Sequence, residues 1–106
     1  MNAGVRHLAI LLLALCPSWL AAQNDGIRLF KSNCALCHAE DGSGNTPSGK
    51  ALEAKDLRSR KTQSKSDAEI ADLIAQGRNK MPGFAQNLKP DQIQQLVAYI
   101  RHLAKK

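Results

Sequence analysis

The sequence predicts a single all-α domain of three or more helices. Its 106 residues allow one domain of ordinary size and no more. Three segments place apolar residues three and four positions apart, which is helical spacing. No segment alternates polar and apolar residues convincingly, so we expect no sheet.

Residues 1–22 are typical of a secretory signal peptide. Arg6 precedes an apolar run at Leu8–Cys16, and small residues follow up to Ala22. We expect cleavage after Ala22, a mature domain at 23–106, and export to the periplasm or a similar compartment. The alternative is an uncleaved membrane anchor, but this apolar run is too short to cross a bilayer core of about 30 Å.

Three longer helices are expected in the mature domain, at 25–35, 66–76 and 90–104. Each has an apolar face with helical spacing, so the three faces can share one core. The residues of these faces are Ile27, Phe30 and Cys34 in the first helix, Ile70, Leu73 and Ile74 in the second, and Ile93, Leu96, Val97, Ile100 and Leu103 in the third.

Capping signals support the second and third of these helices. Ser66 and Glu69 form a capping box at the start of the second, and Gly77 ends it. Pro90 suits the first turn of the third helix, although Lys89 is a poor N-cap.

Two loops separate the helices. The first, between His38 and Ser66, is rich in Gly, Ser, Lys and Asp, and we expect a short helix at Ala51–Leu57 within it. The second runs from Gly77 to Lys89.

The net charge of the chain limits the chemical classes of partner that it can bind. The formal net charge is +6, and removal of Arg6 with the leader leaves +5, because the leader contains no acidic residue. A positive surface suits acidic proteins, anionic lipid or nucleic acid. No basic run is interleaved with aromatic residues, so nucleic acid is not expected. We expect a monomer without stable membrane insertion that docks on proteins with acidic surfaces.

The strongest motif is Cys34-Ala35-Leu36-Cys37-His38. Two cysteines followed at once by histidine form the attachment pattern of a c-type haem. Each thiol adds to one vinyl group, and His38 then binds the iron as an axial ligand when its imidazole is neutral. A zinc site would need a fourth ligand, either His102 or a carboxylate. A thioredoxin-like redox pair would need an alternating strand and helix pattern, which is absent.

Met81 is the candidate for the second axial ligand. It is the only methionine of the mature chain, and it lies in a loop beside Pro82 rather than on an apolar helical stripe. A thioether ligand raises the reduction potential. Lys80, when deprotonated, and His102 are the alternative ligands.

Over Gly26 to Leu103 the chain resembles the class I cytochromes c, in the small single-haem branch of bacteria and algae. The resemblance rests on Cys34 to His38, on Lys80-Met81-Pro82, and on Leu96 to Ile100 in the last helix. It implies the cytochrome c fold, with helices wrapped around one covalently attached haem c. It also implies that the first and last helices cross where Gly26 and Phe30 meet Tyr99.

Two further details follow from the resemblance. It implies that the carbonyl of Pro47 accepts a hydrogen bond from the axial imidazole, although simple loop punctuation is an equal alternative for this proline. The only tryptophan, Trp19, is lost with the leader, so any role of tryptophan near a haem propionate is unfilled. The candidates for that role are Arg58, Arg60, Lys50 and Lys55.

The implied function is outer-sphere transfer of one electron at a time in a respiratory, photosynthetic or dehydrogenase-linked chain, without enzymatic activity. The alternative is a haem enzyme of the peroxidase kind, or a gas sensor, if Met81 is labile. The expected partners are redox proteins with acidic docking surfaces, such as a reductase, an oxidase or a dehydrogenase. The basic residues expected to steer the protein to them are Lys55, Arg58, Arg60, Lys61, Lys65, Arg78 and Lys80.

Overall fold

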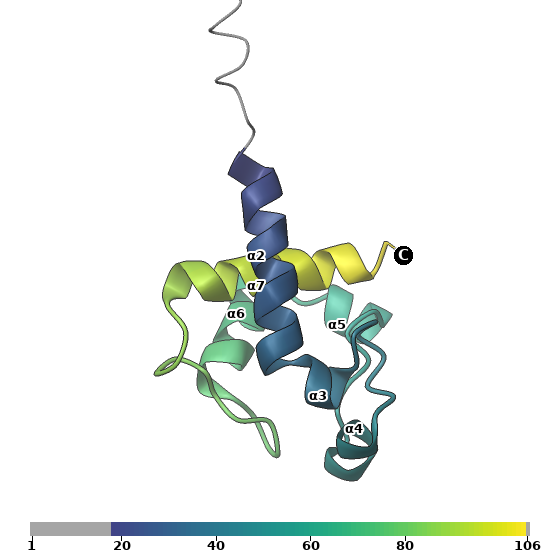
Figure 1. Ribbon diagram of the computed structural model, residues 1–106. Coiled ribbons are helices and arrows are strands. Elements are labelled where there is room, and N and C mark those ends of the chain that lie inside the picture. Colours follow the sequence, from purple (N-terminus) through teal and green to yellow (C-terminus); the bar gives the residue numbers. More distant parts are fainter. Residues whose placement is uncertain (1–17, 106) are drawn as a thin grey trace, which may run out of the picture.

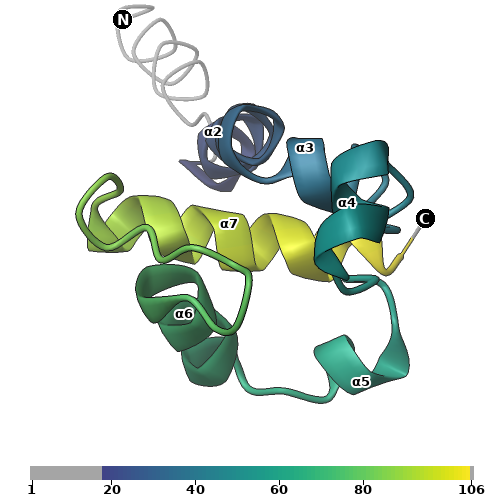
Figure 2. The same cartoon turned by 90° about the horizontal axis from the view of Figure 1, so that it is seen from below.

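The last helix, α7 (Pro90–Leu103), is the element around which the others pack. The computed structural model describes the backbone of residues 18–105, and the expected leader at 1–22 lies mostly outside these residues. In Figure 1, α2 (Ser18–Asn33) crosses α7 steeply near its middle. The view from below in Figure 2 shows α6 (Asp67–Gln76) on the opposite side of α7 from α2. The last helix therefore lies between the first and the second of the predicted helices.

Three short helices complete the order of elements. They are α3 (Ala35–His38), α4 (Pro47–Leu52) and α5 (Arg60–Gln63). Within residues 18–105 the structure has no strand, and the only pairing of that kind is an isolated bridge between Arg78 and Met81. The all-α prediction is confirmed.

The predicted helices differ from the observed ones mainly at the amino-terminal end. The first begins at Ser18 rather than Asp25, because no residue before Asp25 interrupts the helical pattern. It breaks at Cys34 and resumes as α3. The expected cleavage point after Ala22 therefore falls inside α2 of the uncleaved chain.

The second and third predicted helices are confirmed to within one residue. Ser66 and Glu69 form the expected capping box at α6. At α7 the poor N-cap is compensated, because the Lys89 backbone N–H donates to the side-chain oxygen of Gln92 at 2.8 Å.

The short helix expected at Ala51–Leu57 is wrong in position. It begins instead at Pro47, where Thr46 is the N-cap, and it ends because Glu53 adopts a left-handed backbone conformation with φ 60°. Leu57 lies beyond it in a turn.

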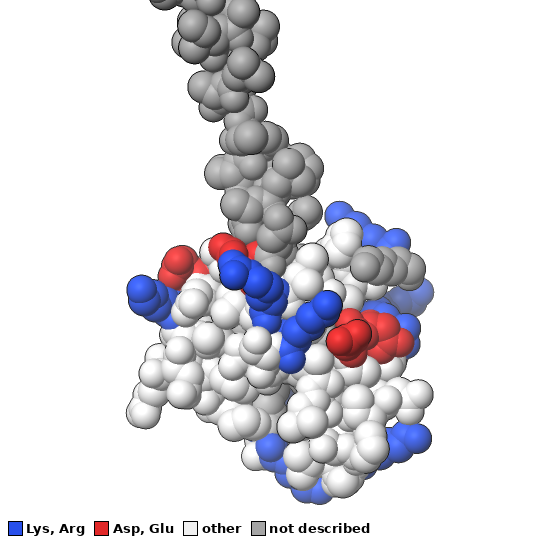
Figure 3. Space-filling model, in the orientation of Figure 1, with Lys and Arg blue, Asp and Glu red and all other residues white. Residues whose placement is uncertain are grey.

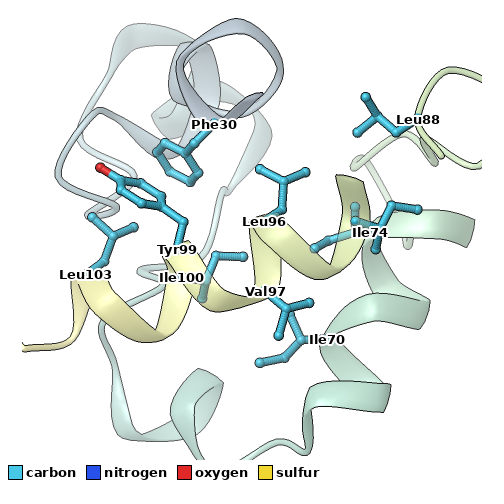
Figure 4. Packing of buried hydrophobic residues seen from close by; sticks show 10 residues of the cluster. Phe30, Ile70, Ile74, Leu88, Leu96, Val97, Tyr99, Ile100 and Leu103 are labelled. Carbon is cyan, nitrogen blue, oxygen red and sulfur yellow. The ribbon is translucent and has the colours of Figure 1, made fainter. Parts of the chain in front are cut away.

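One continuous cluster of apolar side chains joins α2, α6 and α7 (Figure 4). Phe30 and Leu96 are fully buried at its centre, and the ring of Phe30 lies 5.1 Å from that of Tyr99 with a tilt of 51°. The cluster consists of Phe30, Ile70, Ile74, Leu88, Ile93, Leu96, Val97, Tyr99, Ile100 and Leu103.

The crossing of α2 over α7 depends on Gly26. A Cβ at this position would lie 2.8 Å from the backbone oxygen of Gln95 and 3.1 Å from Cβ of Tyr99. Any larger residue therefore pushes the helices apart, and the predicted meeting of Gly26 and Phe30 with Tyr99 is confirmed.

Polar bonds hold the connection between α5 and α6 against α7. The guanidinium of Arg101 donates to the backbone oxygen of Gln63 at 2.9 Å and to that of Lys65 at 2.6 Å. It also donates to the carboxylate of Asp67 at 2.9 Å. One side chain of α7 thus satisfies two carbonyls of a segment that has few apolar contacts of its own.

The helix crossing gives a first testable prediction. Gly26→Val should lower the free energy of unfolding of the haem-bearing protein by about 1–3 kcal/mol, because the branched side chain overpacks the contact with Gln95 and Tyr99. Ser32→Val, at an exposed position of the same helix, introduces the same side chain without that clash and is the control. Denaturant unfolding measures both, and equal losses would contradict the close crossing.

Candidate functional site

The attachment motif lies on the turn that links α2 to the rest of the domain. The backbone N–H of Cys34 still bonds to the carbonyl of Phe30 at 2.8 Å, so the first cysteine continues from the buried face of α2. The N–H of His38 bonds back to the carbonyl of Cys34 at 2.9 Å. One helical turn therefore presents both thiols and the imidazole, and both cysteines are free and half-buried.

The thiol of Cys34 is protonated at neutral pH. Burial, and secondarily the charge of the neighbouring Cys37, raises its pKa from 9.0 to about 12. Reactive redox cysteines have lowered pKa values, so this environment is opposite to that of a thioredoxin-like pair.

The ring of His38 is oriented by a backbone oxygen. Its Nδ1 lies 3.0 Å from the carbonyl oxygen of Lys55. A carbonyl can only accept, so Nδ1 carries a proton, and in the neutral ring Nε2 then keeps a free lone pair. This is the tautomer that an axial imidazole needs, and a hydrogen-bonded Nδ1 makes the opposite nitrogen a better donor to metal.

The acceptor differs from the one that the family resemblance implied. Pro47 is the first residue of α4, where a carbonyl is directed along the helix towards later residues. The imidazole bonds to Lys55 instead, so of the two equal interpretations of Pro47 the structure favours punctuation, here at the start of a helix.

Met81 lies on a tight turn that is fastened to the end of α6. Arg78 and Met81 exchange two backbone hydrogen bonds, of 3.0 and 2.9 Å, and Asn79 between them has φ 55°. Gly77 and Gly83 let the two sides of this loop touch, because a Cβ at Gly77 would lie 2.6 Å from the nitrogen of Gly83. The loop therefore has a fixed backbone rather than an open one.

The structure brings the two halves of the predicted site to one apolar cluster. Cys34 and Met81, which are far apart in the sequence, are both half-buried and pack against the same core. An ion pair of 3.7 Å between Lys80 and Glu53 also joins the methionine loop to the segment that follows α4. Both side chains of this pair are exposed, so it contributes little stability by itself.

His102, an alternative ligand, packs beside Tyr99, and the alternative of a zinc site finds no cluster of ligands in the described part of the chain. The ring of His102 lies 6.3 Å from that of Tyr99 near the end of α7. Among the residues that the structure describes, no group of three or more His, Cys, Asp and Glu side chains could hold a metal ion.

Arg58, a candidate for the propionate, is engaged by two carboxylates. It bonds to Asp56 at 3.0 and 3.1 Å and lies 3.7 Å from Asp41. Its hydrogen bond lowers the pKa of Asp56, and the pKa of Asp41 is lowered chiefly by its bond to Ser43.

Sequence reasoning missed the residues that support the attachment turn from α4. The hydroxyl of Thr46 lies 2.7 Å from the carbonyl oxygen of Leu36 and 3.2 Å from that of Cys37. Gly49 is buried against the same turn, because a Cβ there would overlap the carbonyl oxygens of Cys37 and Gly44. A threonine directly before a proline is a helix-start signal, so the cap at Thr46 could have been found.

The donors on these elements fit a c-type haem. The motif supplies two free cysteines for covalent attachment and an imidazole whose Nε2 is free for iron. The methionine loop supplies a thioether that borders the same apolar cluster. Such a donor set suits iron in an apolar setting, to which it would offer one nitrogen and one sulfur ligand.

Known proteins with similar sequences and structures identify the family. The profile of the family described as cytochrome c oxidase, cbb3-type, subunit III, matches residues 21–100. Cytochrome c6 of Nostoc sp. is 36% identical over 94 residues, which cover 88% of this chain and 82% of that protein. Cytochrome c6 of Thermosynechococcus vestitus is 36% identical over 97 residues, covering 91% and 84%.

A solved structure agrees with these sequence matches. The KustC0563 c-type cytochrome superposes with a TM-score of 0.68 at 30% identity, over 74% of this chain and 95% of that one. Together with the helices and the attachment turn, these similarities show that the chain belongs to the small class I c-type cytochromes, which carry single electrons on one covalently bound haem c.

Proposed function

We propose that this chain holds its haem through thioether bonds to Cys34 and Cys37 and ligates the iron with His38 and Met81. The observation that carries the proposal is the bond from His38 Nδ1 to the Lys55 carbonyl, because it leaves Nε2 free and fixes the ring. The packing of Met81 against the cluster that also contacts Cys34 supports the second ligand.

The haem, when bound, supplies a reversible one-electron couple. The protein's part is to keep the same ligands in both oxidation states. The ring of His38 is held by a backbone carbonyl, and the loop of Met81 is closed by two backbone bonds. Ligands that are fixed in advance need little rearrangement when the charge changes, which favours outer-sphere transfer. With both axial positions filled by protein, neither oxygen nor a substrate reaches the iron.

Partner docking is proposed to use the surface over α3, α4 and the methionine loop. In Figure 3 the lower half of the molecule is largely uncharged, and basic side chains lie along its lower edge. Depletion of charge at the centre, with charged residues at the rim, is typical of a docking surface. Of the seven basic candidates, Arg58 and Lys80 have acidic neighbours within 4.0 Å, whereas Arg60 and Lys61 have none among the described residues.

Export to the periplasm or an equivalent compartment is the third part of the proposal. It rests on the sequence of residues 1–22 and on the use of both remaining cysteines by the haem motif. Among the described residues, no helix is long and apolar enough to cross a membrane.

Replacing the proposed sulfur ligand gives the most direct test of ligation. Met81→Ala should remove the weak long-wavelength band of sulfur-ligated ferric haem, lower the reduction potential, and let the reduced protein bind carbon monoxide. Pro82→Ala changes the same exposed turn without touching the thioether, so it should keep the wild-type spectrum. A Met81→Ala spectrum like that of the wild type would reject this ligand.

Wild-type protein that binds carbon monoxide readily would instead indicate a labile sixth ligand. That result would favour the alternative function, a haem enzyme or gas sensor, to which the relatives give no support.

Electrostatic steering predicts a dependence on salt that changes sign with the probe. Oxidation of the reduced protein by ferricyanide should slow as ionic strength rises, and oxidation by the cationic tris(phenanthroline)cobalt(III) should accelerate. The double variant Arg60→Gln, Lys61→Gln should flatten both slopes more than Lys105→Gln, which lies outside the candidate set. Stopped-flow rates that do not vary with salt for either probe would rule out steering.

Cleavage of the leader is tested by mass. The purified exported protein should begin at Gln23, and its mass should include one covalently attached haem. Ala22→Leu, which enlarges the residue before the expected cut, should shift or block processing. A mature chain that retains Met1 would show that the leader is an anchor.

A further inference from the structure

The helix that carries His38 is too short to be stable by itself. α3 has four residues, whereas isolated helices in water need about 12–15 to persist even with favourable sequences. Its last carbonyl groups have no partner further along the helix, because the chain turns away at Ala39 with φ 65°. The geometry of His38 therefore depends on groups outside α3.

The next loop supplies those groups. The N–H of Gly44 donates to the carbonyl of His38 at 2.7 Å. The hydroxyl of half-buried Thr46 is directed at the two preceding carbonyls, 2.7 Å from that of Leu36 and 3.2 Å from that of Cys37. A hydroxyl has one proton, so the short contact to Leu36 is its main bond and the longer one to Cys37 shares the same proton. Residues 44–46 thus supply two donors, one from Gly44 and one from Thr46, to the carbonyls at the end of the attachment turn.

The same hydroxyl also begins α4. It accepts the backbone N–H of Gly49 at 2.8 Å, which is the N-cap bond of this helix. One side-chain oxygen therefore joins the end of α3 to the start of α4. The absence of a side chain at Gly49 lets the two helices touch, since a Cβ would overlap the Cys37 carbonyl.

A continuous set of bonds leads from this oxygen to the histidine ring. Gly49 accepts the N–H of Ala54 at 2.8 Å, and the next residue, Lys55, offers the carbonyl that orients His38 Nδ1 at 3.0 Å. The backbone of His38 and the acceptor for its ring are therefore both positioned relative to Thr46. Loss of this hydroxyl would let the two move independently.

We propose that Thr46 is a positioning residue for the axial histidine: its hydroxyl ties the attachment turn to α4 and so fixes the orientation of the His38 ring towards the Lys55 carbonyl. This inference rests on the proposed ligation of iron by His38. It means that Thr46 influences the reduction potential although it does not contact the iron.

The test compares haem-bearing wild-type protein with Thr46→Val, which keeps the shape and removes the hydroxyl. A looser bond at Nδ1 makes the imidazole less basic and stabilises ferric iron less. The reduction potential should therefore shift to a more positive value, and the hyperfine-shifted ring signals of His38 should move in nuclear magnetic resonance spectra. Thr46→Ser keeps the hydroxyl and should restore both readouts.

Ser64→Ala is the control. The hydroxyl of Ser64 also donates to a backbone carbonyl, that of Lys61 at 3.1 Å, but this bond lies after α5, away from both the attachment turn and Lys55. Its loss should leave the potential and the His38 signals unchanged. Equal shifts in Thr46→Val and Ser64→Ala, or no shift in Thr46→Val, would overturn the proposal.

A further variant covers the case in which Thr46→Val does not fold. Thr46→Asp can still accept from Gly49 and cap α4, but it cannot donate to the carbonyls of Leu36 and Cys37. Its His38 ring signals should differ from those of the wild type, and unchanged signals would reject the role of Thr46. If the wild-type protein itself shows no iron-bound histidine, the failure lies in the proposed ligation and not in Thr46.

Discussion

The close crossing of α2 over α7 is the constraint on which the rest of the structure depends. Gly26 brings the two backbones together, and Phe30 then reaches Tyr99 in the centre of the core. Since Cys34 follows one turn after Phe30 and its N–H bonds to that residue, the crossing also places the attachment motif. The site is therefore positioned by packing at a point several residues away from it.

The two sides of the site are held by different forces. The histidine side depends on polar bonds from Gly44, Thr46 and Lys55 to a helix of one turn. The methionine side depends on backbone geometry, with two glycines in contact and a paired turn at Arg78 and Met81. Both arrangements restrain the proposed ligands without using bulky side chains. Such restraint suits a protein that changes charge repeatedly while its ligands stay in place.

The parts of the fold predicted correctly from the sequence are those whose signals are local or repeated. The capping box of Ser66 and Glu69 and the apolar stripe of α7 each identify a helix on their own. The short helices α3 and α5 have no such stripe. They are held instead by side chains from other segments, α3 by Thr46 and the end of α5 by Arg101, so their own sequences do not reveal them. The acceptor for His38 could not be predicted for a different reason: every residue has a carbonyl, so nothing in the sequence marks that of Lys55.

The measurement that tests the account most directly is the optical spectrum of the purified wild-type protein, oxidised and then reduced, with and without carbon monoxide. The account predicts a covalent c-type haem spectrum, with the weak long-wavelength band of sulfur-ligated ferric iron and no change on addition of carbon monoxide. A high-spin spectrum that shifts with carbon monoxide would contradict ligation by both His38 and Met81, and with it the function of a closed, outer-sphere electron carrier.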